Sequence, residues 1–342
     1  MFSLKYNRGF KFPKFSSSSG SMMNVNSNSI LISKRSVSIV PPSQITGLLK
    51  DSGKNVIPID CSWYMPNVPI VAFHEFMKRR LGDKAVFFDI DQIKDYSSKY
   101  PHMLPNGKEF AEKVSELGIK NDDDILLYDQ QGIFSVCRAA WMFEIFGHDT
   151  NKIHILNTFP GYIQSFGNPN LVLKIHEAET FINDNLTTQP TTLPPSNYKV
   201  DKFDKNQVIS YEELLELVQN GKIGKEFELI DARSTKRFTG EDPEPRPGLS
   251  SGHIPGAKSL PFTNLLTPTK SLLSSMSLKS EFKNIKIDDS KPIIVMCGTG
   301  VTACVIRTGL LAAGLGKNGI IVYDGSWTEW GQRAPTELII KD

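Results

Sequence analysis

The stretch from Pro292 to Arg307, PIIVMCGTGVTACVIR, constrains the fold more than any other part of the chain. Its first part, Ile293–Met296, is a short apolar run rich in β-branched residues, which predicts a strand buried on both faces. Cys297 follows directly, and a glycine-rich turn then leads into a helical pattern over Ala303–Ala313. Strands that alternate with helical patterns in this way are typical of an α/β fold with a mainly parallel sheet.

The turn after this predicted strand has the chemistry of an anion-binding site. Its two glycines let the backbone curl with N–H groups pointing inward, and the start of the helix adds partial positive charge. Both effects stabilise a thiolate and can lower a thiol pKa from about 8.5 by one to several units. The alternative is a buried structural cysteine, but the position between strand and helix favours a nucleophilic Cys297. The predicted anion nest around it comprises Gly298, Thr299, Gly300, Val301 and Thr302.

Several motifs together resemble those of the rhodanese superfamily. CGTGVTA (297–303) is similar to its active-site loop, and most similar to that of the 3-mercaptopyruvate sulfurtransferase branch. The segment Asp231–Phe262 resembles the family's substrate-binding segment, and YDGSWTEW (323–330) resembles its closing signature. Three further motifs resemble the N-terminal half of tandem members, namely DCSWYMP (60–66), FFDID (87–91) and YPHMLP (100–105). The resemblance covers nearly all of the chain beyond its N-terminal segment.

The chain also contains an internal repeat. The apolar strand that ends at Asp129 aligns with the strand that ends at Cys297, and Gly132 then falls on Gly300. Two copies of one α/β unit explain this alignment. A carboxylate at position 129 cannot accept sulfur, so we expect the N-terminal copy to be catalytically silent and to form one wall of an interdomain cleft.

We therefore predict two tandem rhodanese-like domains, each a mainly parallel sheet flanked by helices. The N-terminal domain is placed at residues 43–175 and the catalytic domain at residues 207–342. Residues 176–206 are expected to form a linker, because TTQPTTLPPSN (187–197) is rich in Thr and Pro and favours an extended chain.

The N-terminal segment differs from the rest in composition. Residues 1–42 are basic, free of acidic residues and rich in Ser, which is typical of a mitochondrial transit peptide. A disordered tail without a targeting role is the alternative. We expect a mitochondrial protein, with the cytoplasm as a second location. Without residues 1–50 the chain is net negative, which gives no reason to expect direct nucleic-acid binding, and no apolar run is long enough to predict a membrane span.

The resemblance implies sulfur transfer through a cysteine persulfide in a two-step, ping-pong cycle. In the family, arginines at the positions of Arg237 and Arg246 hold the carboxylate and carbonyl oxygen of the donor, a geometry that suits guanidinium groups. Because the loop lacks the basic residues of the thiosulfate branch, we expect a preference for 3-mercaptopyruvate over thiosulfate. The implied acceptors are cyanide and thiols such as thioredoxin, glutathione or small thiols. Neither a cofactor nor a metal is expected.

Two other functions are compatible with parts of this pattern. The first is a sulfur relay, as in fungal relatives, in which a cysteine desulfurase loads Cys297 and the sulfur passes to tRNA-thiolation proteins. The second is a phosphatase or arsenate reductase of similar architecture. Those enzymes need an arginine that closes the loop, and position 303 is an alanine.

A Ser-His-Asp set has been proposed to assist the loop in some relatives, and we expect none here. Thr299 replaces the serine, residues 80–85 lack the histidine of the corresponding motif, and His74 is not aligned with it. Three nearby residues are predicted to be structural: Thr302 as the helix cap, Cys304 in the core and His253 in a turn.

Overall fold

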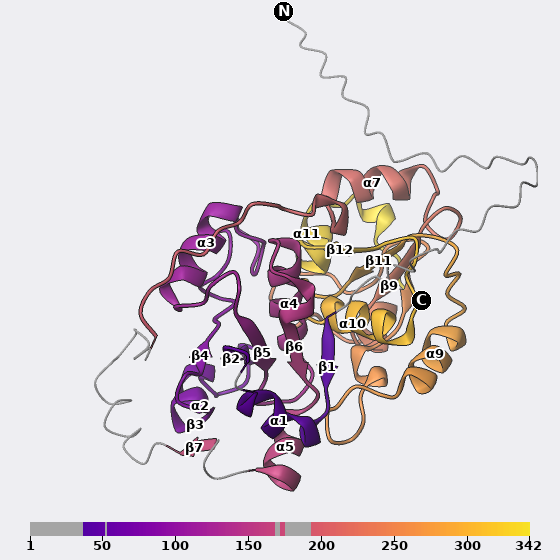
Figure 1. The fold of residues 1–342 in the computed structure, drawn as a ribbon. Helices are drawn as coiled ribbons and strands as arrows, with labels where there is room; N and C mark the ends of the chain where they lie inside the picture. The colour runs from indigo at the N-terminus through magenta and orange to yellow at the C-terminus, as the bar shows by residue number, and fades with distance from the viewer. Residues whose placement is uncertain (1–36, 52, 168–171, 175–192) are drawn as a thin grey trace, which may run out of the picture. The chain divides into compact units, whose positions relative to one another are not determined.

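Two sheets of five strands form the framework of the protein (Figure 1). The computed structural model describes residues 37–51, 53–167, 172–174 and 193–342. The first sheet has the order β1 (Ser38–Val40), β6 (Ile153–Leu156), β5 (Asp124–Tyr128), β2 (Val56–Asp60) and β4 (Val86–Phe87). The second has the order β10 (Lys258–Ser259), β9 (Glu228–Asp231), β11 (Ile293–Met296), β12 (Ile320–Tyr323) and β8 (Val208–Ile209).

The two sheets share one topology, which confirms the internal repeat. Every pair of neighbouring strands in both sheets is parallel. Read from β8, the second sheet runs β8-β12-β11-β9-β10, so its strands follow the same chain order as β1-β6-β5-β2-β4 in the first. The strands β5 and β11, which carry the aligned motifs, are therefore both central, as their continuous apolar runs predict.

The helices alternate with these strands. In the first domain they are α1 (Ile45–Lys50), α2 (Ala72–Lys78), α3 (Gly107–Glu116), α4 (Val136–Ile145) and α5 (Phe159–Phe166). In the second they are α7 (Tyr211–Gln219), α8 (Thr235–Thr239), α9 (Ser275–Asn284), α10 (Ala303–Ala313) and α11 (Ser326–Arg333). A short antiparallel pair, β3 (Arg79–Leu81) and β7 (Val172–Lys174), lies outside the main sheets.

The helices α4 and α10 join the two domains. Each follows the loop at the end of its central strand, and the two helices pack against each other. Both are buried along almost their whole length, including Arg138 in α4 and Arg307 in α10. A helix that is apolar on most of its faces belongs in a core rather than at a surface. The two strand-loop-helix units therefore meet at the domain interface.

One predicted boundary needs correction. The strand β1 pairs with β6, so the folded domain begins before Ser43, the predicted start, because Ser38–Val40 supplies a β-branched edge strand. The described end of the predicted linker packs on the first domain, since Tyr198 is buried and stacks on His148. Residues 1–36 and 175–192 lie outside the described residues, as do most of the predicted transit peptide and linker. No described helix is both long and apolar enough to cross a membrane.

Candidate active site

Cys297 lies at the carboxyl end of β11, and the residue is only 2% exposed. The start of α11 holds it in place from both sides. Its N–H donates to Ser326 Oγ at 3.1 Å, and its carbonyl accepts from the N–H of Trp327 at 3.0 Å. The next carbonyl, of Gly298, accepts from both the N–H and the Oγ1 of Thr328 at 2.9 and 2.7 Å. The closing YDGSWTEW motif thus fixes the backbone at the cysteine.

The loop after Cys297 keeps its backbone donors available. From Gly298 to Thr302 no backbone N–H has a hydrogen-bond partner in the described part of the chain. Gly300 adopts φ +78°, which L side chains rarely adopt, and a Cβ there would lie 2.9 Å from an Arg138 nitrogen. Because unpaired N–H groups are costly in a buried loop, this row of donors is suited to an incoming anion.

In the matching loop of the first domain, backbone N–H groups are already hydrogen-bonded to oxygen atoms of the protein. Asp129, which aligns with Cys297, accepts from the N–H of Gln131 at 2.8 Å and from the N–H and Oγ of Ser135 at 2.9 and 2.6 Å. Lys270 of the second domain closes the loop, since its carbonyl accepts from the N–H of Ile133 at 2.8 Å. Burial raises the pKa of Asp129 to about 7. The carboxylate of Asp129 and the Lys270 carbonyl thus occupy donors of this loop whose counterparts in the second domain, at Thr299 and Val301, have no partner among the described residues, which supports a silent first site.

The structure contradicts the expectation that no histidine assists the loop. His102 Nδ1 lies 3.0 Å from Thr299 Oγ1, and His102 Nε2 lies 3.0 Å from Asp91 Oδ1. Thr299 therefore takes the position of the serine in a hydroxyl–histidine–carboxylate set. Both missed residues belong to motifs that the resemblance had already singled out, Asp91 to FFDID and His102 to YPHMLP. The histidine comes from residues 100–105 rather than from residues 80–85, where the motif of the relatives would place it.

The protonation of this set follows from its surroundings. Burial lowers the pKa of His102 below its ordinary value, although Asp91 opposes this effect, so the imidazole is neutral at neutral pH. Burial raises the pKa of Asp91, but its hydrogen bonds with His102 and Trp63 outweigh burial and hold the pKa below its ordinary value. The ionised Asp91 accepts from the Nε2–H group. The Nδ1 atom is then the acceptor for the Thr299 hydroxyl.

An interdomain ion pair positions His102. Arg138 donates to Asp324 at 2.6 Å and to the carbonyl of His102 at 2.5 Å. The second oxygen of Asp324 accepts from the N–H of Leu104 at 2.7 Å. His102 has φ 62°, a left-handed conformation that is unfavourable for a residue with a side chain. The ion pair thus holds a strained loop of the first domain against the catalytic loop of the second.

The two predicted arginines both lie near the loop, but they differ in their hydrogen bonding. Arg237 is bound to Glu244 by Nε at 3.0 Å and Nη2 at 2.5 Å, and its Nη2 would lie 3.3 Å from a Cβ at position 298, which accounts for Gly298. Arg246 is half-buried and forms no side-chain hydrogen bond or ion pair with any described residue. Burial and the neighbouring Arg237 lower the pKa of Arg246, whereas the Cys297 thiolate opposes this. Such a cation is stabilised by an anion bound beside it.

The remaining predicted residues have structural surroundings. Cys304 is buried, with Sγ 3.3 Å from the carbonyl of Gly300, and burial raises its thiol pKa to about 12. His253 bonds to the carbonyl of Phe238 at 3.0 Å. Thr302 stands at the start of α10, but its side chain caps no N–H, so that prediction was wrong. The described residues contain no cluster of three or more His, Cys, Asp or Glu able to hold a metal ion.

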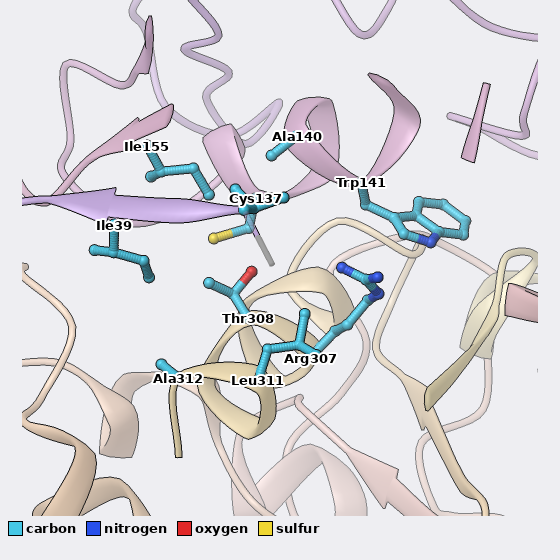
Figure 2. Close-up of a pocket in the computed structure, with 10 residues that line it drawn as sticks. Ile39, Cys137, Ala140, Trp141, Ile155, Arg307, Thr308, Leu311 and Ala312 are labelled. Carbon is cyan, nitrogen blue, oxygen red and sulfur yellow. The ribbon is translucent and has the colours of Figure 1, made fainter. Parts of the chain in front are cut away.

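Two cavities lie near the domain interface. An enclosed one of about 40 Å³ lies between α4 and α10 and is lined by Cys137, Trp141, Arg307 and apolar side chains (Figure 2). Cys297 does not line it, and its size suits a buried water rather than a substrate. The second is an open cleft of about 500 Å³ that is lined by Arg246 and by Thr328, the residue bonded to the loop carbonyl.

Comparison with known proteins agrees with this geometry. A model of the rhodanese-like domain matches residues 210–333. The thiosulfate sulfurtransferase TUM1 of Saccharomyces cerevisiae is 34% identical over 89% of this chain and 97% of its own length. The chain belongs to the rhodanese family. The family model covers only the catalytic domain, but the common strand order shows that both domains have the rhodanese fold.

One further relative and two solved structures support the family. The mitochondrial thiosulfate/3-mercaptopyruvate sulfurtransferase 1 of Arabidopsis thaliana is 39% identical over 80% of this chain and 70% of its own length. The crystal structure of yeast Tum1 superposes with a TM-score of 0.79, covering 89% of this chain and 98% of that one. A sulfur transferase subunit of yeast mitochondrial complex I is 39% identical, with a TM-score of 0.77 and coverage of 89% and 99%. These matches confirm the tandem rhodanese architecture along the chain.

Proposed function

We propose that this protein is a sulfurtransferase that moves sulfur from 3-mercaptopyruvate, and less efficiently from thiosulfate, to thiol or cyanide acceptors through a persulfide on Cys297. The observation that carries the proposal is the row of unpartnered N–H groups from Gly298 to Thr302, beside a cysteine at the end of a central strand. Those donors stabilise a thiolate before transfer and a persulfide anion after it. The names of the relatives support the same reaction class.

The first half-reaction needs a nucleophile and a proton source. The Cys297 thiolate attacks the donor sulfur, and an S–S bond forms as the carbon–sulfur bond breaks. The electron pair passes to the enolate of pyruvate, which then needs a proton. The donor's own thiol is the source of that proton. Thr299 bonds to neutral His102, so the set can take the proton from the donor S–H as the persulfide anion forms and return it to the enolate carbon. Thiosulfate leaves sulfite instead, a stable anion that needs no proton from the set.

The preference for 3-mercaptopyruvate rests on the distribution of charge. Arg246, which has no partner among the described residues, is available for the carboxylate of the donor, and the guanidinium of Arg237 lies beside Gly298. The loop itself offers backbone donors and the uncharged Thr299. A compact dianion such as thiosulfate gains less from this arrangement than a carboxylate on a short carbon chain.

A sulfur relay is the second candidate, and it uses the same cysteine. In that case a cysteine desulfurase loads Cys297 and tRNA-thiolation proteins take the sulfur. The similarity to a yeast sulfur transferase found in mitochondrial complex I favours protein partners of some kind. Together with the mitochondrial relative from Arabidopsis, it also supports a mitochondrial location. The cytoplasm is proposed as a second location. A phosphatase is not favoured, because the residue that would close its loop is a buried alanine, Ala303.

The deciding experiment measures turnover of 3-mercaptopyruvate and thiosulfate side by side with one acceptor. The proposal expects a higher kcat/KM for 3-mercaptopyruvate. A higher value for thiosulfate would reject the assigned donor, and faster loading by a cysteine desulfurase than by either donor would favour the relay.

A further inference from the structure

The open cleft of about 500 Å³ is larger than the proposed donor requires. Pockets of roughly 300–1,000 Å³ hold ligands of drug size, whereas the donor is a three-carbon acid. The cleft is bounded on one side by residues 94–101 of the first domain and on the other by residues 246–249 and α11 of the second. Thr328, one of its lining residues, is bonded to the carbonyl of Gly298, next to Cys297. The cleft therefore borders the catalytic loop through this residue.

The wall of this cleft is positively charged. Its lining contains Lys94, Lys99 and Arg246 and no acidic residue. Neither lysine forms a direct ion pair in the described part of the chain; their ammonium groups lie over the rings of Tyr96 and Tyr100 at 5.7 and 5.1 Å. Lys94 interacts at longer range with Asp89 and Asp91, and Asp91 is already bonded to His102. The donor's carboxylate needs Arg246, which leaves two lysine cations without a role in the first half-reaction.

We infer that this cleft, with Lys94 and Lys99 on its rim, is the binding site for the acceptor, and that it selects a small thiol carrying more than one carboxylate. This inference rests on the proposed function and names the acceptor class of the same site. In the second half-reaction the acceptor thiolate attacks the outer sulfur of the persulfide. A new S–S bond forms on the acceptor, the bond to Cys297 breaks, and its electron pair returns to the Cys297 thiolate. Two anions must therefore meet, and cations on the rim offset their repulsion.

The test compares two acceptors of different charge on loaded full-length protein. Cys297 is first loaded with 3-mercaptopyruvate, and loading is verified by intact mass. Loss of the persulfide is then followed against the concentration of glutathione, which has two carboxylates, and of dithiothreitol, which is neutral. The variant is Lys94→Glu/Lys99→Glu. The matched control is Lys279→Glu/Lys283→Glu, which reverses two exposed charges on α9 outside the cleft.

The readout is the ratio of the two second-order rate constants, glutathione over dithiothreitol. In the cleft variant this ratio should fall about tenfold, because the reversed charges repel the carboxylates of glutathione. In the control the ratio should stay within about twofold of wild type, because the reversed charges lie outside the cleft. Added salt should lower the wild-type ratio as well. An unchanged ratio in the cleft variant, or an equal fall in the control, would overturn the inference. Failure of the wild type to load would instead reject the proposed function.

Discussion

The guanidinium of Arg138 and the carboxylate of Asp324 form a buried ion pair at 2.6 Å that links the two domains beside Gly300. The same guanidinium bonds to the backbone of His102. The first domain thus contributes more than a wall to the cleft. It supplies the histidine that faces the catalytic loop and the cation that holds this histidine in place.

Removal of one partner of that pair should strongly destabilise the fold. Arg138→Met leaves Asp324 charged and buried, and breaking a buried pair in this way costs on the order of 3–5 kcal/mol. Urea unfolding should show this as a lower midpoint. The double variant Arg138→Met/Asp324→Asn should recover part of the loss, because the remaining amide oxygen can still accept from Leu104. A loss below about 1 kcal/mol in the single variant would mean that the pair behaves like an exposed one.

Replacement of His102 should separate the two donors. His102→Asn replaces the imidazole beside Thr299 by an amide that cannot take up and return a proton, and loss of a positioned proton relay typically costs about 10²–10⁴-fold in rate. We expect kcat with 3-mercaptopyruvate to fall by about a hundredfold or more, and kcat with thiosulfate to fall much less. Steady-state kinetics with both donors checks this. Equal losses would show that His102 has only a structural role.

The pH profile gives an independent check on the same residue. Since burial lowers the pKa of His102, the histidine should become protonated only below the ordinary histidine range. The rate with 3-mercaptopyruvate should therefore hold through neutral pH and fall on the acidic side of that range. The fall should be absent from His102→Asn. If the fall in rate at acidic pH persisted unchanged in His102→Asn, it would be caused by the titration of another group.

The limits of prediction from sequence are clear in this site. Local pattern was enough for β11 and α10, whose bounds agree with the predicted ranges Ile293–Met296 and Ala303–Ala313, and for the position of Cys297 after β11. The contact between His102 and Thr299 depends on how two domains pack, and local periodicity does not encode that. The missing cap at Thr302 has a similar cause, since the loop before α10 leaves its donors open instead of closing them on a side chain.

The buried Asp129 should make stability depend on pH. Its pKa is about 7 in the fold and 3.8 in an ordinary setting, so between these values the unfolded chain ionises while the native residue stays protonated. Native stability is therefore greatest below pH 4 for this group, falls as pH rises to about 7 and then levels off. Burial raises the pKa of the nearby Asp60 to about 6, which adds to the same trend.

The variant Asp129→Asn isolates this effect. The difference in unfolding free energy, variant minus wild type, should increase with pH by on the order of 2–4 kcal/mol between about pH 4 and 7. The hydrogen bonds that the amide cannot form in place of the carboxyl group change this difference by the same amount at every pH. Denaturant unfolding at several pH values measures the difference, and a difference that is flat or decreases with pH would contradict the raised pKa.

Replacement of Arg246 should affect the donor with a carboxylate most. Arg246→Ala removes an unpaired guanidinium, and a lost charged hydrogen bond costs about 1.5–3 kcal/mol, or roughly ten- to a hundredfold in kcat/KM for 3-mercaptopyruvate. The kcat/KM for thiosulfate should fall less than that for 3-mercaptopyruvate. Lys236→Ala, at an exposed position on α8, is the matched control and should change neither donor. Equal losses for both donors would reject the role of Arg246 in carboxylate binding.

The most direct test of the account is the intact mass of the protein after incubation with 3-mercaptopyruvate and removal of excess donor. Wild type and Cys304→Ser should each gain the mass of one sulfur atom, because Cys304 is buried with its thiol pKa raised to about 12. Cys297→Ser should gain none, since a hydroxyl cannot form a persulfide. A Cys297→Ser protein that still acquired sulfur, or a wild type that did not, would contradict the central role of Cys297.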